Sequence, residues 1–297
     1  MLNDELKKKI EDAFDSKIKA TEALTKQVTL LSFNDSKMII KKVNTKTKNI
    51  YDFLASQKVE NVLYPLKKII YDKECYFVYK YINSYEYPNE KKIKDMIESV
   101  DEVHKKTGFT VRLTDSNFKF FMRIYKNLDR IFQTLEMFIR ECEGKTKKTD
   151  FDWIVLSKYH IYLTTKKMMY SLQRKIHKYI DNNGNCIYSL NHGNLNLNHY
   201  VQRKLLSFDN AYVGIFISDF AKLYVSVDDI DGEWFSDLEA KINSYGNDFY
   251  KIYFKFLVLY IYIINLRFSS FDEHTVLKTY NQLSMKISRF LTLTSSY

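Results

Sequence analysis

Three polar motifs in the second half of the chain are the most specific part of its sequence. Residues 190–201 read LNHGNLNLNHYV, residues 205–211 read LLSFDNA, and residues 218–222 read SDFAK. The surrounding segment, 181–216, holds three of the seven glycines and several asparagines, so it interrupts the helical pattern on both sides. Its short apolar runs predict a compact β-hairpin from Tyr200–Val201 and residues 204–208. The segment is therefore a polar loop set among helices.

Helical patterns surround this loop. From Glu90 onward, Ile93, Ile97, Val100 and His104 share one face. Long amphipathic helices are then predicted over residues 115–142 and 151–180, with the polar stretch 144–150 between them, and helices resume at residue 218.

The first 82 residues have a different pattern. Leu6, Ile10, Phe14 and Ile18 are four apart behind Asn3, which predicts an amphipathic helix capped by Asn3. Two β-hairpins follow, with strands at residues 28–33 and 37–43, then 62–71 and 75–82, and a short helix at 50–57 lies between them. We therefore expect an α+β lobe over residues 1–82 and a mainly helical lobe over residues 83–297, with the loop 181–216 embedded in it.

Composition excludes several classes of protein. The chain has 297 residues with 45% hydrophobic content, including 24 Tyr and 21 Phe, which is enough apolar surface for a folded core. The net charge is +10, but the lysines are scattered among acids and only 8 of the 46 basic residues are Arg, so a nucleic-acid partner is not predicted. The three cysteines are far apart, which predicts neither disulfides nor a Cys-x-x-Cys metal site.

Two further features bear on location. The most apolar run, residues 256–266, has 11 residues, whereas a membrane span needs about 20, so no membrane span is expected. The charged N-terminal segment lacks the apolar stretch of a secretory signal. We therefore expect the protein to be made in the cytoplasm without a signal peptide.

The loop motifs resemble the aminoglycoside and choline kinase-like family, which has the pattern His-Gly-Asp, four residues, Asn, a strand ending in Ile-Asp-Phe or Ile-Asp-Trp, and Asp-Leu-Ala. Within that superfamily the chain resembles the CotS-type spore coat proteins, through residues 149–152 (TDFD), 104–109 (HKKTGF) and 208–211 (FDNA). The resemblance implies a protein kinase-like two-lobed α+β fold, with a small β-rich N-lobe and a large, mainly helical C-lobe. It also implies a place in the spore coat, with other spore coat proteins as partners.

The resemblance assigns roles to individual positions. Three residues match the family and shape the loop or contact phosphate: His192 as a loop residue, Asp219 as the anchor of the loop, and Lys41 as the strand lysine that binds the cofactor. Lys42 is adjacent, so the strand register is open, and Asp52 is the acid nearest to Lys41 in the following segment.

The chemical positions depart from the family. Asn194 stands where the catalytic base would be, and a carboxamide cannot take up a proton. His199 and Ser207 stand at the two metal positions, although magnesium prefers hard oxygen ligands such as carboxylates. Asp209 is a weak candidate for holding the metal, and Asn198 could replace the displaced Asn through a local slip. The earliest glycine is Gly108, so no glycine-rich phosphate loop precedes the strand lysine.

These departures predict a catalytically impaired pseudokinase with no cofactor, acting as a structural or scaffolding protein. Two alternatives remain. One is an ATP-dependent phosphotransferase of the aminoglycoside or choline kinase type, whose cationic substrate would be met by acids among Asp228, Asp229, Asp231 and Glu233. The other is a regulatory pseudokinase that binds nucleotide without turnover.

Two weaker hypotheses complete the sequence reading. His192 and His199 could suggest zinc, but no further ligand stands at a suitable spacing. Tyrosines crowd the predicted connector between the lobes and would serve as core and interface residues, or else in assembly contacts and oxidative cross-linking; they are Tyr76, Tyr79, Tyr81, Tyr85 and Tyr87.

Overall fold

The computed structural model describes residues 2–82, 87–182, 184–266 and 273–294, and within these it leaves out the side chains of 115–122. The chain folds into two compact units. Unit 1 comprises Met1–Gly108, Ser189–Asp219 and Gly232–Trp234, and unit 2 comprises Phe109–Tyr188, Phe220–Asp231 and Phe235–Tyr297. The division into these units is not the division into lobes at residue 82, because unit 1 continues to Gly108 and includes the polar loop. The lobe boundary at residue 82 stays a prediction.

Unit 1 is built on a five-stranded antiparallel sheet with the strand order β1-β2-β3-β5-β4. The strands are β1 (Ala20–Ala23), β2 (Val28–Ser32), β3 (Lys37–Val43), β4 (Lys67–Tyr71) and β5 (Glu74–Lys80). Strand β3 is central, and its Lys41 is paired in register with Val28 of β2 and Phe77 of β5. This register fixes which residues of β3 share a face with Lys41.

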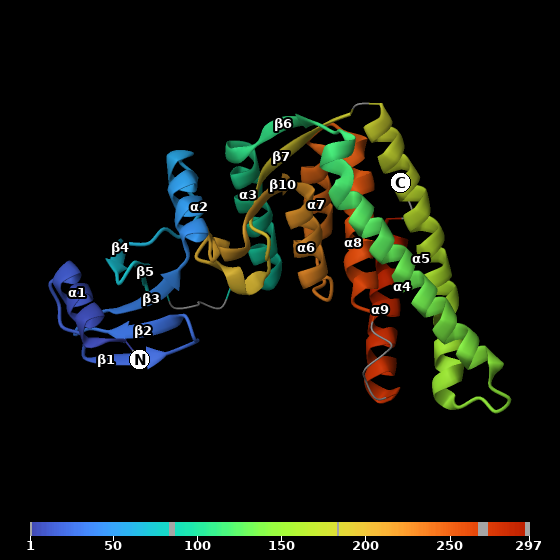
Figure 1. Cartoon of the computed structure of the whole chain (residues 1–297), viewed down its shortest axis with the longest axis horizontal. Helices are drawn as coiled ribbons and strands as arrows, with labels where there is room; N and C mark the ends of the chain where they lie inside the picture. Colours follow the sequence, from blue (N-terminus) through green and yellow to red (C-terminus); the bar gives the residue numbers. More distant parts are fainter. Residues whose placement is uncertain (1, 83–86, 183, 267–272, 295–297) are drawn as a thin grey trace. The chain divides into compact units, whose positions relative to one another are not determined.

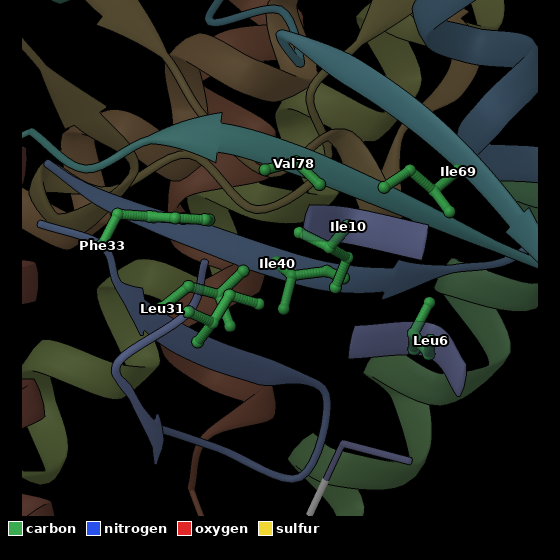
Figure 2. Packing of buried hydrophobic residues seen from close by; sticks show 8 residues of the cluster. Leu6, Ile10, Leu31, Phe33, Ile40, Ile69 and Val78 are labelled. Carbon is green, nitrogen blue, oxygen red and sulfur yellow. The ribbon is translucent and has the colours of Figure 1, made fainter. Parts of the chain in front are cut away.

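Helix α1 (Asp4–Phe14) covers one face of this sheet (Figure 1). The side chain of Asn3 accepts a hydrogen bond from the Glu5 amide at 2.8 Å, which confirms the predicted cap. Figure 2 shows Leu6 and Ile10 of α1 packed with apolar residues of the strands. The helix ends earlier than the four-residue spacing predicts, because Asp15 adopts a left-handed conformation; Ile18 lies beyond the helix but still packs in the same core.

Three other boundaries in unit 1 differ from the sequence prediction. Helix α2 spans Thr45–Ser56 rather than starting at residue 50, because the Asn44 side chain caps it by accepting from the Thr47 amide at 2.8 Å. Strand β4 starts at Lys67, since Val62 instead forms a parallel bridge with Leu205. Strand β1 was not predicted, because all four of its residues are exposed and carry no apolar alternation.

The later segments of unit 1 carry the polar loop. Helix α3 (Asn89–Thr107) buries Ile93, Ile97, Val100 and His104, as the spacing predicts. Strand β7 (Asn185–Asn191) leads into the loop, and the predicted hairpin is present but short, formed by β8 (Tyr200–Val201) and β9 (Lys204–Leu205). Residues 208–210 form a 3-10 turn instead of extending the hairpin to Phe208, and β10 (Tyr212–Ile215) precedes α6 (Ile217–Val227).

Unit 2 is mainly helical. Four long helices pack together, with α5 against α4, α8 and α9; their bounds are α4 (Asp115–Gly144), α5 (Asp150–Asp181), α8 (Asp248–Ile264) and α9 (Glu273–Leu293). Helix α5 begins with a capping box between Thr149 and Asp152, the start that its sequence predicts. In the core, the Tyr162 hydroxyl donates to the Tyr280 carbonyl at 2.9 Å.

Unit 2 also includes residues 220–227 of α6, together with a short strand and a shorter helix. Strand β6 (Phe109–Arg112), which the sequence did not predict, pairs with the first residues of β7, and α7 spans Trp234–Asn243. Within the described ranges, no helix has both the length and the apolar character that crossing a membrane requires.

Candidate functional site

The polar loop of unit 1 is organised around one buried carboxylate, that of Asp219. It accepts hydrogen bonds from the backbone amides of His192 at 2.6 Å and Gly193 at 3.0 Å, and from His104 Nε2 at 3.2 Å. Asp219 is 1% exposed. Burial by itself would raise the pKa of Asp219, but the hydrogen bond from His104, the neighbouring imidazoles and the backbone amide hold it below its ordinary value. The geometry therefore places Asp219 where the sequence predicts an anchor.

Gly193 is the position where the loop needs a glycine. Its φ is +81°, and a Cβ added there would lie 2.2 Å from the Asn210 carbonyl oxygen. A side chain would thus meet both an unfavourable backbone conformation and a fixed backbone atom. The close approach of residues 193 and 210 brings the two halves of the motif together.

His192 holds the loop rather than facing outward. Its Nε2 lies 2.6 Å from the Leu206 carbonyl, which can only accept, so Nε2 carries the proton. Burial lowers the pKa of His192, so the ring is neutral at pH 7 and its Nδ1 can accept the Asn194 amide at 3.4 Å. The ring also stands edge-on to Phe208, with 4.7 Å between ring centroids.

The two positions that replace a base and a metal ligand contact each other. Asn194 is exposed, and its backbone carbonyl oxygen accepts a hydrogen bond from Nδ1 of His199 at 2.6 Å. His199 is thus bonded within its own loop, and Asn198 beside it is exposed. The rings of His192 and His199 are 5.5 Å apart between centroids, but a search of the described residues finds no group of three His, Cys, Asp or Glu that could hold a metal.

Lys41 of β3 and Asp209 of the 3-10 turn are 168 residues apart in sequence but lie in contact. The Lys41 ammonium forms an ion pair with Oδ2 of Asp209, and the other carboxylate oxygen accepts from the Thr47 hydroxyl at 3.5 Å. The Lys41 side chain is 15% exposed and that of Asp209 is 36% exposed. Both carboxylate oxygens therefore have partners within the protein.

The ion pairs show which of the two adjacent lysines of β3 lies near Asp209. Lys42 lies on the opposite face of the strand and pairs at the surface with Glu74 at 3.0 Å, so Lys41 is the lysine on the face toward Asp209. Asp52 does not pair with Lys41; it binds Lys48 at 3.0 Å and Lys68. Asp52, the nearest acid in the segment after Lys41, is therefore not its partner, because the lysines that bind Asp52 lie on α2 and β4.

Ser207 has an unusual backbone. Its φ and ψ are 60° and 64°, a left-handed conformation that a non-glycine residue seldom adopts. Such a conformation costs free energy and is typical of functional sites in proteins. The Ser207 side chain brings no negative charge to this position.

A cavity of about 190 Å³ lies beside Lys41 and Ser207. Apolar residues form most of its walls, and its lining comprises Val28, Ile39, Lys41, Tyr51, Leu63, Tyr79, Lys80, Ile82, Val201, Leu206 and Ser207. Burial raises the pKa of Tyr51 and of Tyr79. Sequence reasoning missed Tyr51 as a cleft residue and took Tyr79 for part of a connector, whereas Tyr79 lies in β5; Tyr85 lies outside the described residues. The strand predicted at residues 75–82 already included Tyr79, and its apolar run was the signal, since Phe77, Val78 and Tyr79 are all buried in β5.

Two of the four acids proposed to meet a cationic substrate, Asp228 and Asp231, have cationic partners within unit 2. Asp228 is 5% exposed, binds Lys286 at 2.6 Å, and accepts from the Tyr262 hydroxyl. Asp231 binds Arg289 at 2.8 Å. These ion pairs explain the buried carboxylate as part of the packing of unit 2.

Comparison with solved structures identifies the fold. The chain is similar to an aminoglycoside phosphotransferase from Alicyclobacillus acidocaldarius, with 13% identity over 93% of this chain and 91% of that one and a TM-score of 0.65. It is also similar to a spectinomycin phosphotransferase solved with ADP and spectinomycin, with 9% identity over 98% of both chains and a TM-score of 0.54. A third match is a putative aminoglycoside phosphotransferase from Ralstonia eutropha, with 11% identity over 96% of this chain and 98% of that one and a TM-score of 0.51.

No protein-family model matches the sequence, and no curated protein matches it either. At these identities the structural likeness shows the fold alone. The chain has the kinase-like α+β fold that its loop motifs predict, with an antiparallel sheet in its N-terminal part and mostly helices in its C-terminal part.

Proposed function

We propose that this kinase-like protein is impaired in phosphoryl transfer and serves as a structural component of the spore coat. The observation that carries the proposal is that Asp209, the carboxylate beside Lys41, is already bound by side chains of the protein. Asp209 is held by Lys41 and Thr47, and the position that should supply a second carboxylate is Ser207. A magnesium ion would have to compete with the Lys41 ammonium for the charge of Asp209.

The chemistry of phosphoryl transfer explains why this matters. The reaction is accelerated mostly by positioning and by neutralising phosphate charge, for which magnesium is central. A neutral serine supplies no charge, and His199 offers an imidazole nitrogen where magnesium prefers a hard oxygen ligand. Asn194 cannot act as a base, which by itself costs a rate factor of about 10²–10⁴.

Apart from Lys41, the residues that match the family are ones that the fold needs. Asp219, Gly193 and His192 bind backbone groups or allow backbones to approach, and none of these three requires a substrate. A structural role uses this retained architecture without the chemistry. The motif resemblance supports the coat as the setting and other coat proteins as partners. Recovery of the protein in the coat fraction of spores would support this setting, and recovery only in the soluble fraction of growing cells would contradict it.

The proposal is tested by thermal unfolding with ATP, in the presence and absence of magnesium, together with an assay for ADP release. We expect the natural chain to show no magnesium-dependent rise in Tm and no turnover. Ser207→Asp should gain a magnesium-dependent rise, because Asp tolerates the left-handed backbone and adds the missing carboxylate. Asp209→Asn is the matched control and should not gain it.

The result that would overturn the proposal is ADP release by the natural chain that is lost in Asp209→Asn. That outcome would favour the alternative, an ATP-dependent phosphotransferase. It would also mean that the Lys41–Asp209 pair opens when nucleotide enters.

The open cavity favours a second candidate function, which is nucleotide binding without turnover. A planar heterocycle could enter the space lined by Ile39, Tyr79 and Leu206, and Lys41 at its edge offers a cation to a phosphate. In the same experiment, a rise in Tm with ATP that is equal with and without magnesium supports this candidate. An unchanged Tm supports the purely structural role.

A further inference from the structure

Unit 2 carries a lysine-lined groove between α5 and α8. The groove has a volume of about 740 Å³, within the range of small-molecule and peptide sites. Its lining residues are spaced three or four apart on each helix, so each helix contributes one face. From α5 these are Thr164, Lys167, Met168, Ser171, Leu172 and Lys175, and from α8 they are Asp248, Lys251, Ile252 and Lys255; Thr294 completes the lining.

Positive charge gathers along this groove. Four lysines face one acid, Asp248, which is exposed and lies 3.7 Å from Lys251. Burial lowers the pKa of Lys255, and the charges of Lys175 and Lys251 lower it further, against a raising effect from Glu239. In the described part of the chain neither Lys167 nor Lys175 forms an ion pair, and both are exposed. An incoming anionic group would relieve this repulsion.

The floor of the groove is apolar. Met168 and Ile252 are half-buried and Leu172 is buried, between the lysines in sequence and on the same helix faces. A purely phosphate-binding surface gains nothing from such a floor, and lysines lack the planar fork with which arginine grips phosphate. An occupant that matches both features carries carboxylates beside apolar side chains.

We propose that this groove docks an acidic, amphipathic segment of a partner protein. Apolar residues at helical spacing would cover Met168 and Ile252, and flanking carboxylates would meet Lys167, Lys175 and Lys251, as in other helix-in-groove complexes. The groove shares no residue with the cleft around Lys41 and Asp209, so this proposal does not depend on whether the cleft is active.

The test uses the full chain and a labelled synthetic peptide of about four helical turns, with leucines at helical spacing and glutamates elsewhere. A second peptide has the same composition with its leucines out of phase, and inorganic polyphosphate serves as a competing probe. The groove variant is Lys167→Glu with Lys175→Glu. Its control is Lys26→Glu with Lys147→Glu, two exposed lysines outside the groove lining whose reversal changes the net charge equally.

We expect fluorescence anisotropy at low salt to show that the groove variant weakens peptide binding about tenfold or more, and that the control variant weakens it less than about twofold. The out-of-phase peptide should bind less tightly, and Met168→Ser should weaken the in-phase peptide. Equal losses in the groove and control variants would show that only net charge matters. Polyphosphate binding as tight as that of the peptide, or unchanged peptide binding by Met168→Ser, would show that the groove binds any polyanion. Each of these results, and also the absence of peptide binding, overturns the proposal.

Discussion

The substitution Asp219→Asn tests the organisation of the loop most directly. The side chain keeps its shape but loses its charge, and one acceptor oxygen becomes an NH₂ group. Three donors converge on this carboxylate: the amides of His192 and Gly193, at 2.6 and 3.0 Å, and Nε2 of His104, at 3.2 Å. In the variant, at least one of these donors would face another donor.

The magnitude follows from burial. Hydrogen bonds to a charged group contribute about 1.5–3 kcal/mol each, and such contributions are not additive within one network. Leaving a buried donor without its acceptor costs about 1–3 kcal/mol. Since Asp219 is 1% exposed and all three donors lose a charged acceptor, we expect the free energy of unfolding to fall by about 3 kcal/mol.

Urea unfolding followed by circular dichroism measures this change. Asp209→Asn is the matched control: it also removes a carboxylate from the loop region, but Asp209 is 36% exposed, so a loss of only about 1 kcal/mol is expected. A loss below about 1 kcal/mol for Asp219→Asn, or one equal to the control, would refute the assignment of Asp219 as the anchor.

The pH dependence gives a second readout for Asp219. Its pKa is below the ordinary value in the folded state, so its charge stabilises the fold fully above the unfolded pKa of about 3.9. That contribution is lost as the pH falls through the folded pKa. The difference in stability between the natural chain and Asp219→Asn should therefore be constant from about pH 5 to 8 and shrink in acid.

Two further predictions concern the backbone and the tyrosines. Gly193→Ala should lower the free energy of unfolding by about 2 kcal/mol or more, through its positive φ and the contact with the Asn210 carbonyl, whereas Gly144→Ala, with nothing within 4 Å, should change it by about 1 kcal/mol at most; thermal unfolding of both variants decides this. Burial raises the pKa of Tyr200 and of Tyr250 to about 12, so the fold should lose stability between about pH 10 and 12, because the unfolded chain ionises first. Ultraviolet absorbance should show a late class of tyrosines, and ionisation of all tyrosines near pH 10 in the folded protein would contradict this.

Much of the fold could be predicted from local signals in the sequence. Helices α3, α4 and α5 follow apolar spacing, and the start of α5 follows its capping box. Strand β1 could not be found this way, because its position depends on pairing with β2 and its own residues are all exposed. The start of α2 was missed because its first five residues, 45–49 (TKTKN), carry no apolar side chain, so the apolar pattern begins only at Ile50.

For the candidate site, too, only the local part could be predicted. The resemblance of the loop motifs assigns roles to His192, Asn194, His199, Ser207 and Asp219, which lie close together in sequence. The partner of Lys41 could not be predicted, because Asp209 is 168 residues away and reaches Lys41 only through the folded sheet and loop. The same holds for the cavity, which long-range packing creates.

The backbone at Ser207 bears on how the proposed loss of phosphoryl-transfer chemistry should be understood. If folding had required the substitution, serine should suit this position better than aspartate. The left-handed conformation at φ 60° and ψ 64° argues otherwise, because Asp and Asn adopt it more readily than most other non-glycine residues. Asn194 is exposed and His199 is only half-buried, so packing does not demand their identities either. The buried Asp219 and the crowded Gly193 are therefore constrained by folding, whereas folding does not constrain the positions that would carry chemistry. The proposed impairment of phosphoryl transfer is compatible with an intact loop for this reason.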